Sequence, residues 1–249
     1  LMGLFQIPPQ TRYDLNFTLF NIPIRVHPLF WLIALLFGAS AGSLPGVIIW
    51  ILVVFISILI HELGHSLMMK AFEQDSFIVL HGFGGLAVPT SSRWGPVALN
   101  SNQQIMISLA GPFAGFLLAF AVLAVVGALG GVITSTLFLG FIPFPIAGFP
   151  NGGLINSVIG ALLWVNIFWG LINLVPIFPL DGGQVARELF IKADPWGGVR
   201  KSLWLSVISG ATVALVGFVY LNSIYMALLF GLLAFQNYQM LQSGGGRMF

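Results

Sequence analysis

The feature that most constrains this chain is a group of three ionisable side chains inside a long apolar run. His61, Glu62 and His65 follow residues 47–60, which are almost wholly apolar, and the apolar run resumes before Lys70. Such a run is long enough for a membrane span. Ionisable groups within a span are costly, so this group indicates a functional site.

The spacing of these residues indicates the chemistry. Residues four apart share one face of a helix, so His61 and His65 can bind one zinc ion together. Glu62 then reaches a water molecule bound to the metal. Residues 61–65 form an HExxH motif, and its position predicts a zinc metalloprotease that works inside a bilayer, with Glu62 as the general base.

The composition supports a membrane protein. Hydrophobic residues make up 58% of the chain and charged residues only 6%, whereas soluble domains carry about 25% charge. We expect one membrane domain over residues 1–249, with an N-terminal arm (1–26), a core (46–183) and a flexible tail (243–249). The absence of cysteine excludes disulfides and thiolate metal sites. The small excess of Lys and Arg gives no nucleic-acid-binding patch.

Hydropathy predicts an all-α membrane protein with six transmembrane helices. They cover residues 27–42, 46–69, 105–129, 156–175, 202–221 and 224–240. Residues 132–155 are also apolar, but prolines and glycines interrupt them, so we expect a loop or re-entrant segment. With six spans every Lys and Arg falls on one side, which predicts cytoplasmic termini. We expect the inner membrane of a prokaryotic cell.

A small β element is predicted at the cytoplasmic edge. Residues 76–89 combine β-branched and aromatic residues with glycines, which favours a short strand or hairpin. An open strand edge cannot face lipid. We expect a substrate in extended form to pair with residues 77–88, where Gly84 and Gly85 allow a close backbone approach. Residues 91–104 are polar and are expected to form a loop.

A catalytic zinc ion usually takes three protein ligands, and Asp181 is the best third candidate. Pro176 and Pro179 end the fourth span just before it. Asp181 precedes Arg187 by a short stretch, so it lies, like His61, in the cytoplasmic half of the membrane. We expect one zinc ion per chain. Asp181 also suits a helix cap, and this interpretation stays open.

Several motifs together resemble the site-two protease family of intramembrane zinc metalloproteases. They are HExxH on the second span, Ala110-Gly111-Pro112, and Asn-x-x-Pro-x-x-Pro-x-Asp-Gly from Asn173 to Gly182. The resemblance implies zinc ligands at His61, His65 and Asp181, and an acid/base role for Glu62. It implies that Asn173 holds the substrate or the oxyanion, unless it makes an interhelical hydrogen bond.

The resemblance also implies the substrates. This family cleaves transmembrane segments of single-span proteins, and so releases membrane-held regulators. We expect a compact member without a PDZ or CBS domain.

Three other classes of protein share part of this pattern. An integral-membrane metal-ion transporter would place His and Asp in its spans, but the outer half of this chain lacks further such residues. A metallopeptidase that cuts outside the bilayer would need a downstream glutamate ligand, and Glu188 lacks the motif around it. A purely structural protein leaves the buried charges unexplained. His27 and His81 are expected to be polar or interfacial histidines rather than ligands.

Overall fold

The computed structural model describes residues 7–39, 42–82, 84–90, 98–138, 140 and 142–243. It contains two compact units. The first comprises mainly Gly3–Val97 and Ala110–Gly170, and the second Ala98–Leu109 and Leu171–Phe249.

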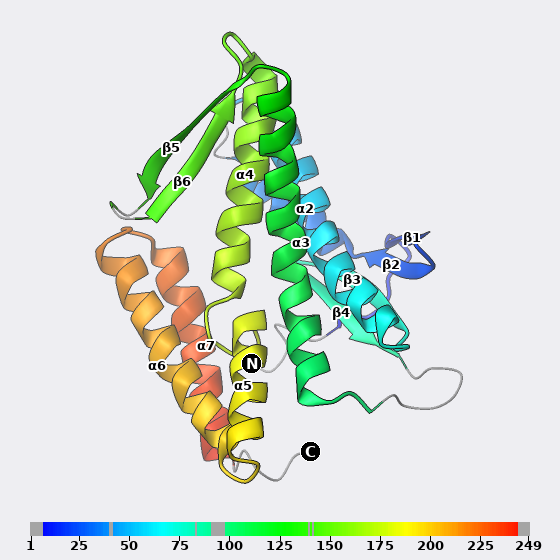
Figure 1. The fold of residues 1–249 in the computed structure, drawn as a ribbon, viewed down its shortest axis with the longest axis vertical. Helices are drawn as coiled ribbons and strands as arrows, with labels where there is room; N and C mark the ends of the chain where they lie inside the picture. The colour runs from blue at the N-terminus through cyan, green and yellow to red at the C-terminus, as the bar shows by residue number, and fades with distance from the viewer. Residues whose placement is uncertain are drawn as a thin grey trace. The chain divides into compact units, whose positions relative to one another are not determined.

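The secondary structure is mainly helical (Figure 1). The helices in the described residues are α1 (Pro28–Gly38), α2 (Leu44–Ala71), α3 (Ser101–Ala128), α4 (Gly153–Asn173), α5 (Asp181–Ala193), α6 (Gly198–Val219) and α7 (Ile224–Gln242). The strands are β1 (Leu15–Leu19), β2 (Ile22–Val26), β3 (Ser76–His81), β4 (Gly84–Pro89), β5 (Val132–Phe138) and β6 (Ile142–Gly148).

Within the described ranges, five helices are long and apolar enough to cross a membrane, namely α2, α3, α4, α6 and α7. They indicate an integral membrane protein, as the composition predicts. The predicted first span is shorter than expected. Helix α1 has 11 residues and measures about 16 Å, whereas a bilayer core is about 30 Å thick. The count of six spans is therefore not confirmed.

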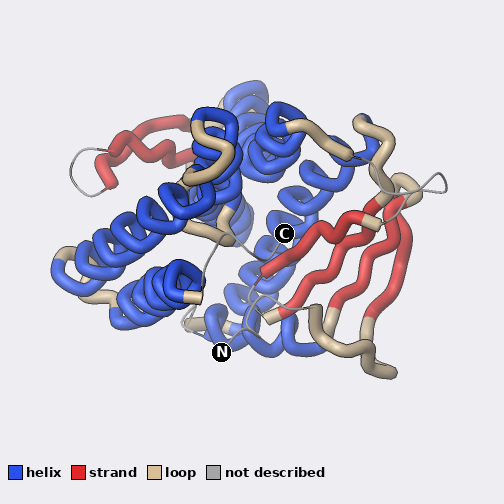
Figure 2. Tube along the Cα trace, turned by 90° about the horizontal axis from the view of Figure 1, so that it is seen from below, coloured by secondary structure: helices blue, strands red, loops and turns tan. Residues whose placement is uncertain are grey.

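The predicted β element is part of a larger sheet with the order β1-β2-β3-β4 (Figure 2). Its two added strands come from the N-terminal arm. Strands β2 and β3 are parallel, because α1 and α2 connect them, and the other pairs are antiparallel. Side chains of the sheet and of α1 and α2 share one core, which includes Ile24, Phe30, Ile58 and Ile78. Burial of this apolar surface holds the sheet against the helices.

Strand β2 and helix α1 follow α2 along much of its length. Lys70 Nζ donates to the carbonyl oxygen of Phe20, just before β2. At the far end of α1, a Cβ on Gly38 would lie 2.8 Å from Cδ1 of Trp50. From Lys70 to Trp50, α2 covers about 30 Å at roughly 1.5 Å per residue. The strand and the short helix in series thus lie beside this length of α2.

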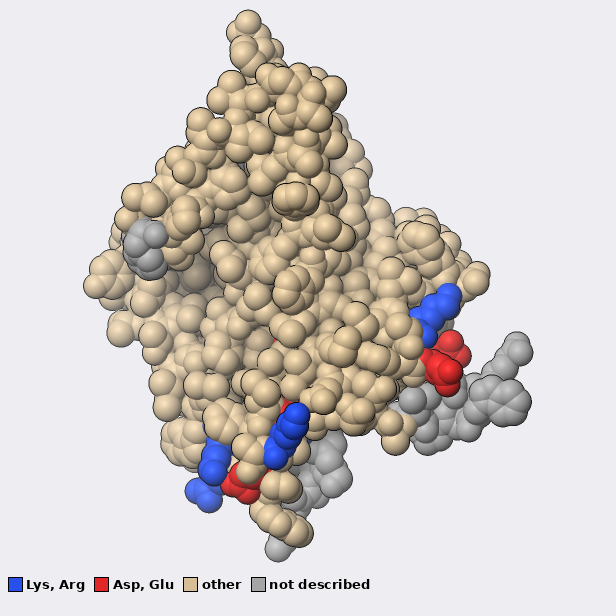
Figure 3. All heavy atoms as spheres, in the orientation of Figure 1, with Lys and Arg blue, Asp and Glu red and all other residues tan. Residues whose placement is uncertain are grey.

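Residues 132–155 contain no helix before α4. Strands β5 and β6 form an antiparallel hairpin, and an aromatic cluster holds it on α4. Phe138 and Phe144 both pack on Trp164, which stacks on Phe168 at 4.7 Å. No charged side chain is visible on this hairpin or the adjoining ends of α3 and α4 in Figure 3. The prediction of a loop or re-entrant segment is refined to a β-hairpin.

Helix α3 begins earlier than the expected third span. Asn100 Oδ1 accepts from the Gln103 amide, and Gln103 Oε1 accepts from the Asn100 amide. This reciprocal capping box starts the helix at Ser101, within the segment expected to be loop. Pro112 consequently lies inside α3.

The second unit is built around the antiparallel helices α6 and α7. Gly210 allows a close approach, since a Cβ there would lie 3.0 Å from Cβ of Ala234. Buried Phe230 and Leu233 fill the adjoining core. Helix α5 packs on α6.

Candidate metal centre

The two histidines of the HExxH motif face one another on α2, as their spacing predicts. His61 and His65 are buried, and their Nε2 atoms lie 3.1 Å apart. Two imidazoles bound to tetrahedral zinc at about 2.0–2.1 Å place their nitrogens about 3.3 Å apart. The pair therefore fits a zinc ion through both Nε2 atoms.

Glycines leave room beside these imidazoles where α3 meets α2. A Cβ on Gly111 would overlap Nε2 of His65 and lie 2.8 Å from Nε2 of His61. On the α2 side of the same contact, a Cβ on Gly64 would collide with the carbonyl of Ala110 and lie 2.9 Å from Cβ of Ala114, both on α3. The small residues thus let the two helices pack closely, with no side chain of Gly111 beside the Nε2 atoms.

Glu62 lies against strand β4. Its side chain is buried, and a Cβ on Gly85 would lie 2.5 Å from Oε1 of Glu62. Gly85 therefore makes space for the predicted general base, which is a structural reason for a glycine at this position. Neighbouring Gly84 has φ +125°, a conformation that side chains disfavour. The predicted contact of either glycine with substrate stays a prediction.

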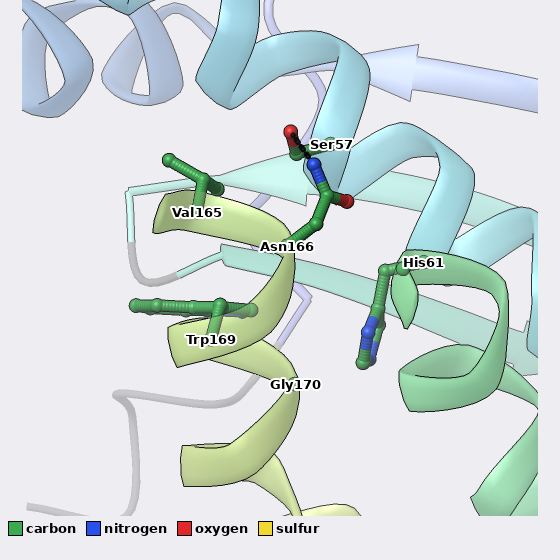
Figure 4. A pocket seen from close by; sticks show the side chains of 7 residues that line it. Ser57, His61, Val165, Asn166, Trp169 and Gly170 are labelled. Atoms are coloured by element: carbon green, nitrogen blue, oxygen red, sulfur yellow. Dashed lines mark hydrogen bonds between the residues drawn. The ribbon is translucent and has the colours of Figure 1, made fainter. Parts of the chain in front are cut away.

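A small cavity lies beside His61, between α2, α3 and α4 (Figure 4). Its volume is about 10 Å³, and its lining includes Ser57, Gly115, Asn166 and Trp169. Asn166 donates from Nδ2 to Ser57 Oγ at 2.9 Å. The sequence analysis missed Ser57 and Asn166. A polar residue within each apolar span was the available signal, but their pairing joins residues far apart in the sequence.

In the second unit, Asp181 is the first residue of α5, and Leu180 is the N-cap. A carboxylate in the first turn suits the helix dipole. Gly182 and Gly183 lie against the backbone of the loop that follows α4, because a Cβ on either would collide with that backbone. The Asp-Gly-Gly sequence therefore permits a tight turn directly before and through Asp181.

Two buried polar residues hold this loop at Phe178. Ser206 Oγ on α6 accepts from the Phe178 amide at 3.0 Å, and Asn237 Nδ2 on α7 donates to the Phe178 carbonyl at 2.7 Å. These bonds fix the backbone just ahead of Asp181. The sequence analysis missed both residues, since their partners are backbone groups of a distant loop.

The other polar residues considered in the sequence analysis, Asn173, His27 and His81, lie at the ends of helices or strands. Asn173 is buried and is the last residue of α4. His27 is the N-cap of α1, where its Nδ1 accepts from the Leu29 amide at 3.2 Å. His81 is buried at the end of β3. The predicted role of Asn173 stays a prediction.

Comparison with known proteins shows to which family the chain is related. A model of peptidase family M50 matches residues 49–216. A zinc metalloprotease of Methanocaldococcus jannaschii is 28% identical, with 88% of this chain and 53% of the relative covered. A putative zinc metalloprotease of Synechocystis is 33% identical, with 69% and 42% covered. The chain spans about half the length of the curated relatives it matches.

A solved structure has the same fold. The site-2 protease from Methanocaldococcus jannaschii superposes with a TM-score of 0.54 at 23% identity, with 95% of this chain and 97% of that chain covered. The matched region contains the HExxH and Asp-Gly motifs, which define a metallopeptidase of the site-two protease type. The chain belongs to peptidase family M50. The predicted family is thus confirmed, and the comparisons do not support a metal-ion transporter.

Proposed function

We propose that this protein is an intramembrane zinc metalloprotease. It hydrolyses peptide bonds in or near the transmembrane segment of single-span proteins, including membrane-held regulators. The observation that carries the proposal is the buried HExxH group on α2, a helix long and apolar enough to cross a membrane. Ionisable groups at such a place are costly unless they have a function.

The proposed ligand set is His61, His65 and Asp181, which hold one zinc ion. The histidines offer imidazole nitrogens and Asp181 offers a carboxylate oxygen, a donor set typical of catalytic zinc. Bound zinc would acidify its water toward a pKa of about 7 and polarise the scissile carbonyl. The tight turn at Gly182 and the bonds to Phe178 support a fixed position for Asp181.

Glu62 is the proposed general base. Its carboxylate takes the proton of the attacking water and then passes it to the leaving amine. Burial against β4 limits the conformations of this side chain. Asn173 is proposed to hold the substrate or the oxyanion.

Strand β4 is the proposed binding edge for an extended substrate segment. Within the described part of the chain no strand pairs with its outer edge. The Thr90 amide donates to the Asp75 carbonyl at 2.7 Å, so alternation turns the polar backbone groups of Gly85 and Ala87 outward. Pro89, which lacks an N–H, occupies the next outward position. An extended substrate segment that adds to this edge would lie beside Glu62.

The proposed topology has six crossings and cytoplasmic termini, with α1 as a short first crossing beside the five long helices of the described residues. A helix shorter than the bilayer core is accommodated by local thinning of the bilayer. Arg25 on β2 then stays on the cytoplasmic side with the other Lys and Arg residues.

Metal analysis of purified protein tests the function. Wild-type protein should hold one zinc ion per chain, and chelation should abolish cleavage of a reconstituted single-span substrate until zinc is restored. Asp181→Ala should weaken zinc binding and abolish activity. Full zinc content with normal activity in Asp181→Ala would refute the ligand assignment, whereas activity that survives complete zinc removal would refute the proposed function.

A further inference from the structure

Two buried polar side chains in the second unit lie on helices that are long and apolar enough to span a membrane. Ser206 on α6 and Asn237 on α7 are each 1% exposed. Polar side chains in such helices commonly hydrogen-bond to a neighbouring helix. Among the described residues neither side chain does so, because outside its own helix each bonds to a backbone group of Phe178. The two bonds therefore converge on one residue of the loop before α5.

The loop around Phe178 lacks donors of its own. Pro176 and Pro179 on either side have no N–H, and a backbone group without a partner is costly when it is shielded from water. Asn237 supplies a donor although its own Oδ1 is buried without a hydrogen bond in the described part of the chain. An unsatisfied buried oxygen is destabilising. Asn237 therefore indicates a requirement beyond helix packing.

A short and closely packed path connects Phe178 to Asp181. The Leu180 amide donates to the Ile177 carbonyl at 2.8 Å, so the loop turns directly into α5. A Cβ on Gly183, in the first turn of α5, would collide with the backbone nitrogen of Phe178. The first turn of α5, which begins with Asp181, consequently lies against the backbone that Ser206 and Asn237 hold.

We propose that Ser206 and Asn237 are positioning residues for Asp181 and act through the backbone of Phe178. Their bonds hold both polar backbone groups of Phe178, which gives the turn into α5 a single position. The Asp181 carboxylate is thereby kept in place for zinc. Helices α6 and α7 thus contribute to metal binding although neither supplies a ligand. This inference rests on the proposed zinc site.

Ser206→Ala and Ser202→Ala form a matched pair of variants on α6. Both serines are buried. Ser202 Oγ donates to the Val199 carbonyl at 2.8 Å, and Ser206 Oγ donates to the Ser202 carbonyl at 2.9 Å. Of the two, Ser206 alone also accepts from the Phe178 amide. Ser206→Ala therefore removes a bond to the loop, whereas Ser202→Ala removes only a bond within the helix.

The measurements are zinc affinity, by chelator competition, and the visible absorption of the Co²⁺-loaded protein, which reports ligand geometry. Ser206→Ala and Asn237→Leu should each weaken zinc binding about tenfold or more and alter the Co²⁺ spectrum, while Ser202→Ala matches wild type. In the Asp181→Ala background, Ser206→Ala should cause no further loss of affinity, because the ligand that it positions is gone.

Unchanged zinc affinity in Ser206→Ala, or an equal loss in Ser202→Ala, would overturn the proposal. A full additional loss in the Asp181→Ala background would also overturn it, since Ser206 would then act by general destabilisation. Two other results have a different meaning. Wild-type protein that binds no zinc would refute the proposed function, and full zinc affinity in Asp181→Ala would refute the ligand assignment.

Discussion

At the scale of single residues, a glycine on α3 is as important to the proposed site as the residues proposed to bind zinc. Gly111 offers no side chain at the point where α3 passes the two imidazoles. A methyl group there would occupy the space beside both Nε2 atoms. The glycine of the Ala110-Gly111-Pro112 motif thus leaves this space free of a side chain of its own.

Gly111→Ala should therefore lower zinc affinity about tenfold or more, comparable to the loss of a group that orients a metal-binding histidine, and should lower protease activity with it. Chelator competition measures the affinity. Gly127→Ala on the same helix is the control, because its Cβ would make only an ordinary contact of 3.4 Å with Ile133. Equal affinities of Gly111→Ala and wild type would show that the imidazoles do not bind metal through their Nε2 atoms.

Some site residues can be predicted from the sequence and others cannot, because some of their interactions are local and others join distant parts of the chain. His61, Glu62 and His65 are recognisable because one helical turn brings them together, so their relation is local. Asn166 and Ser57 interact across more than 100 residues of chain, and a single sequence carries no signal for that pairing. Asp181 is intermediate: the prolines before it predict the end of α4 correctly, but its place at the start of α5 depends on the two following glycines.

At the scale of elements, the sheet is the main departure from expectation. The segment 76–89 predicts a hairpin from its own composition, and β3 and β4 confirm it. Strands β1 and β2 lie within the apparently irregular arm, and β2 pairs with β3 only because α1 and α2 bring it back. Long-range pairing of this kind is not encoded in the local sequence pattern.

A prediction at the scale of elements concerns the pairing of substrate with the outer edge of β4. Ala87→Pro removes one outward N–H while it leaves the ladder to β3 intact, because the partner-facing groups belong to alternate residues. Cleavage of a reconstituted single-span substrate should slow about tenfold, the effect of roughly one lost hydrogen bond, with zinc content unchanged.

Ala87→Val retains the amide and serves as the control, with a rate near that of wild type. If Ala87→Pro cleaved as fast as Ala87→Val, the substrate would not pair with this edge.

At the scale of the whole molecule, charge and hydropathy predict the topology. All nine Lys and Arg residues fall on one side if α1 makes the first of six crossings. Single cysteines at Asp75 and Asn151 should then react with a membrane-impermeant reagent from opposite faces, with Asp75 cytoplasmic. Labelling of both from one face would contradict the six-crossing arrangement but not the protease assignment.

The central claim is that Glu62 activates water at a zinc site inside the membrane, and Glu62→Gln tests it most directly. The amide cannot accept the proton of the water but is similar in size to the carboxylate. The variant should retain one zinc ion per chain, while cleavage of a reconstituted single-span substrate falls by about 10²–10⁴-fold. Cleavage near the wild-type rate by zinc-loaded Glu62→Gln would contradict the account.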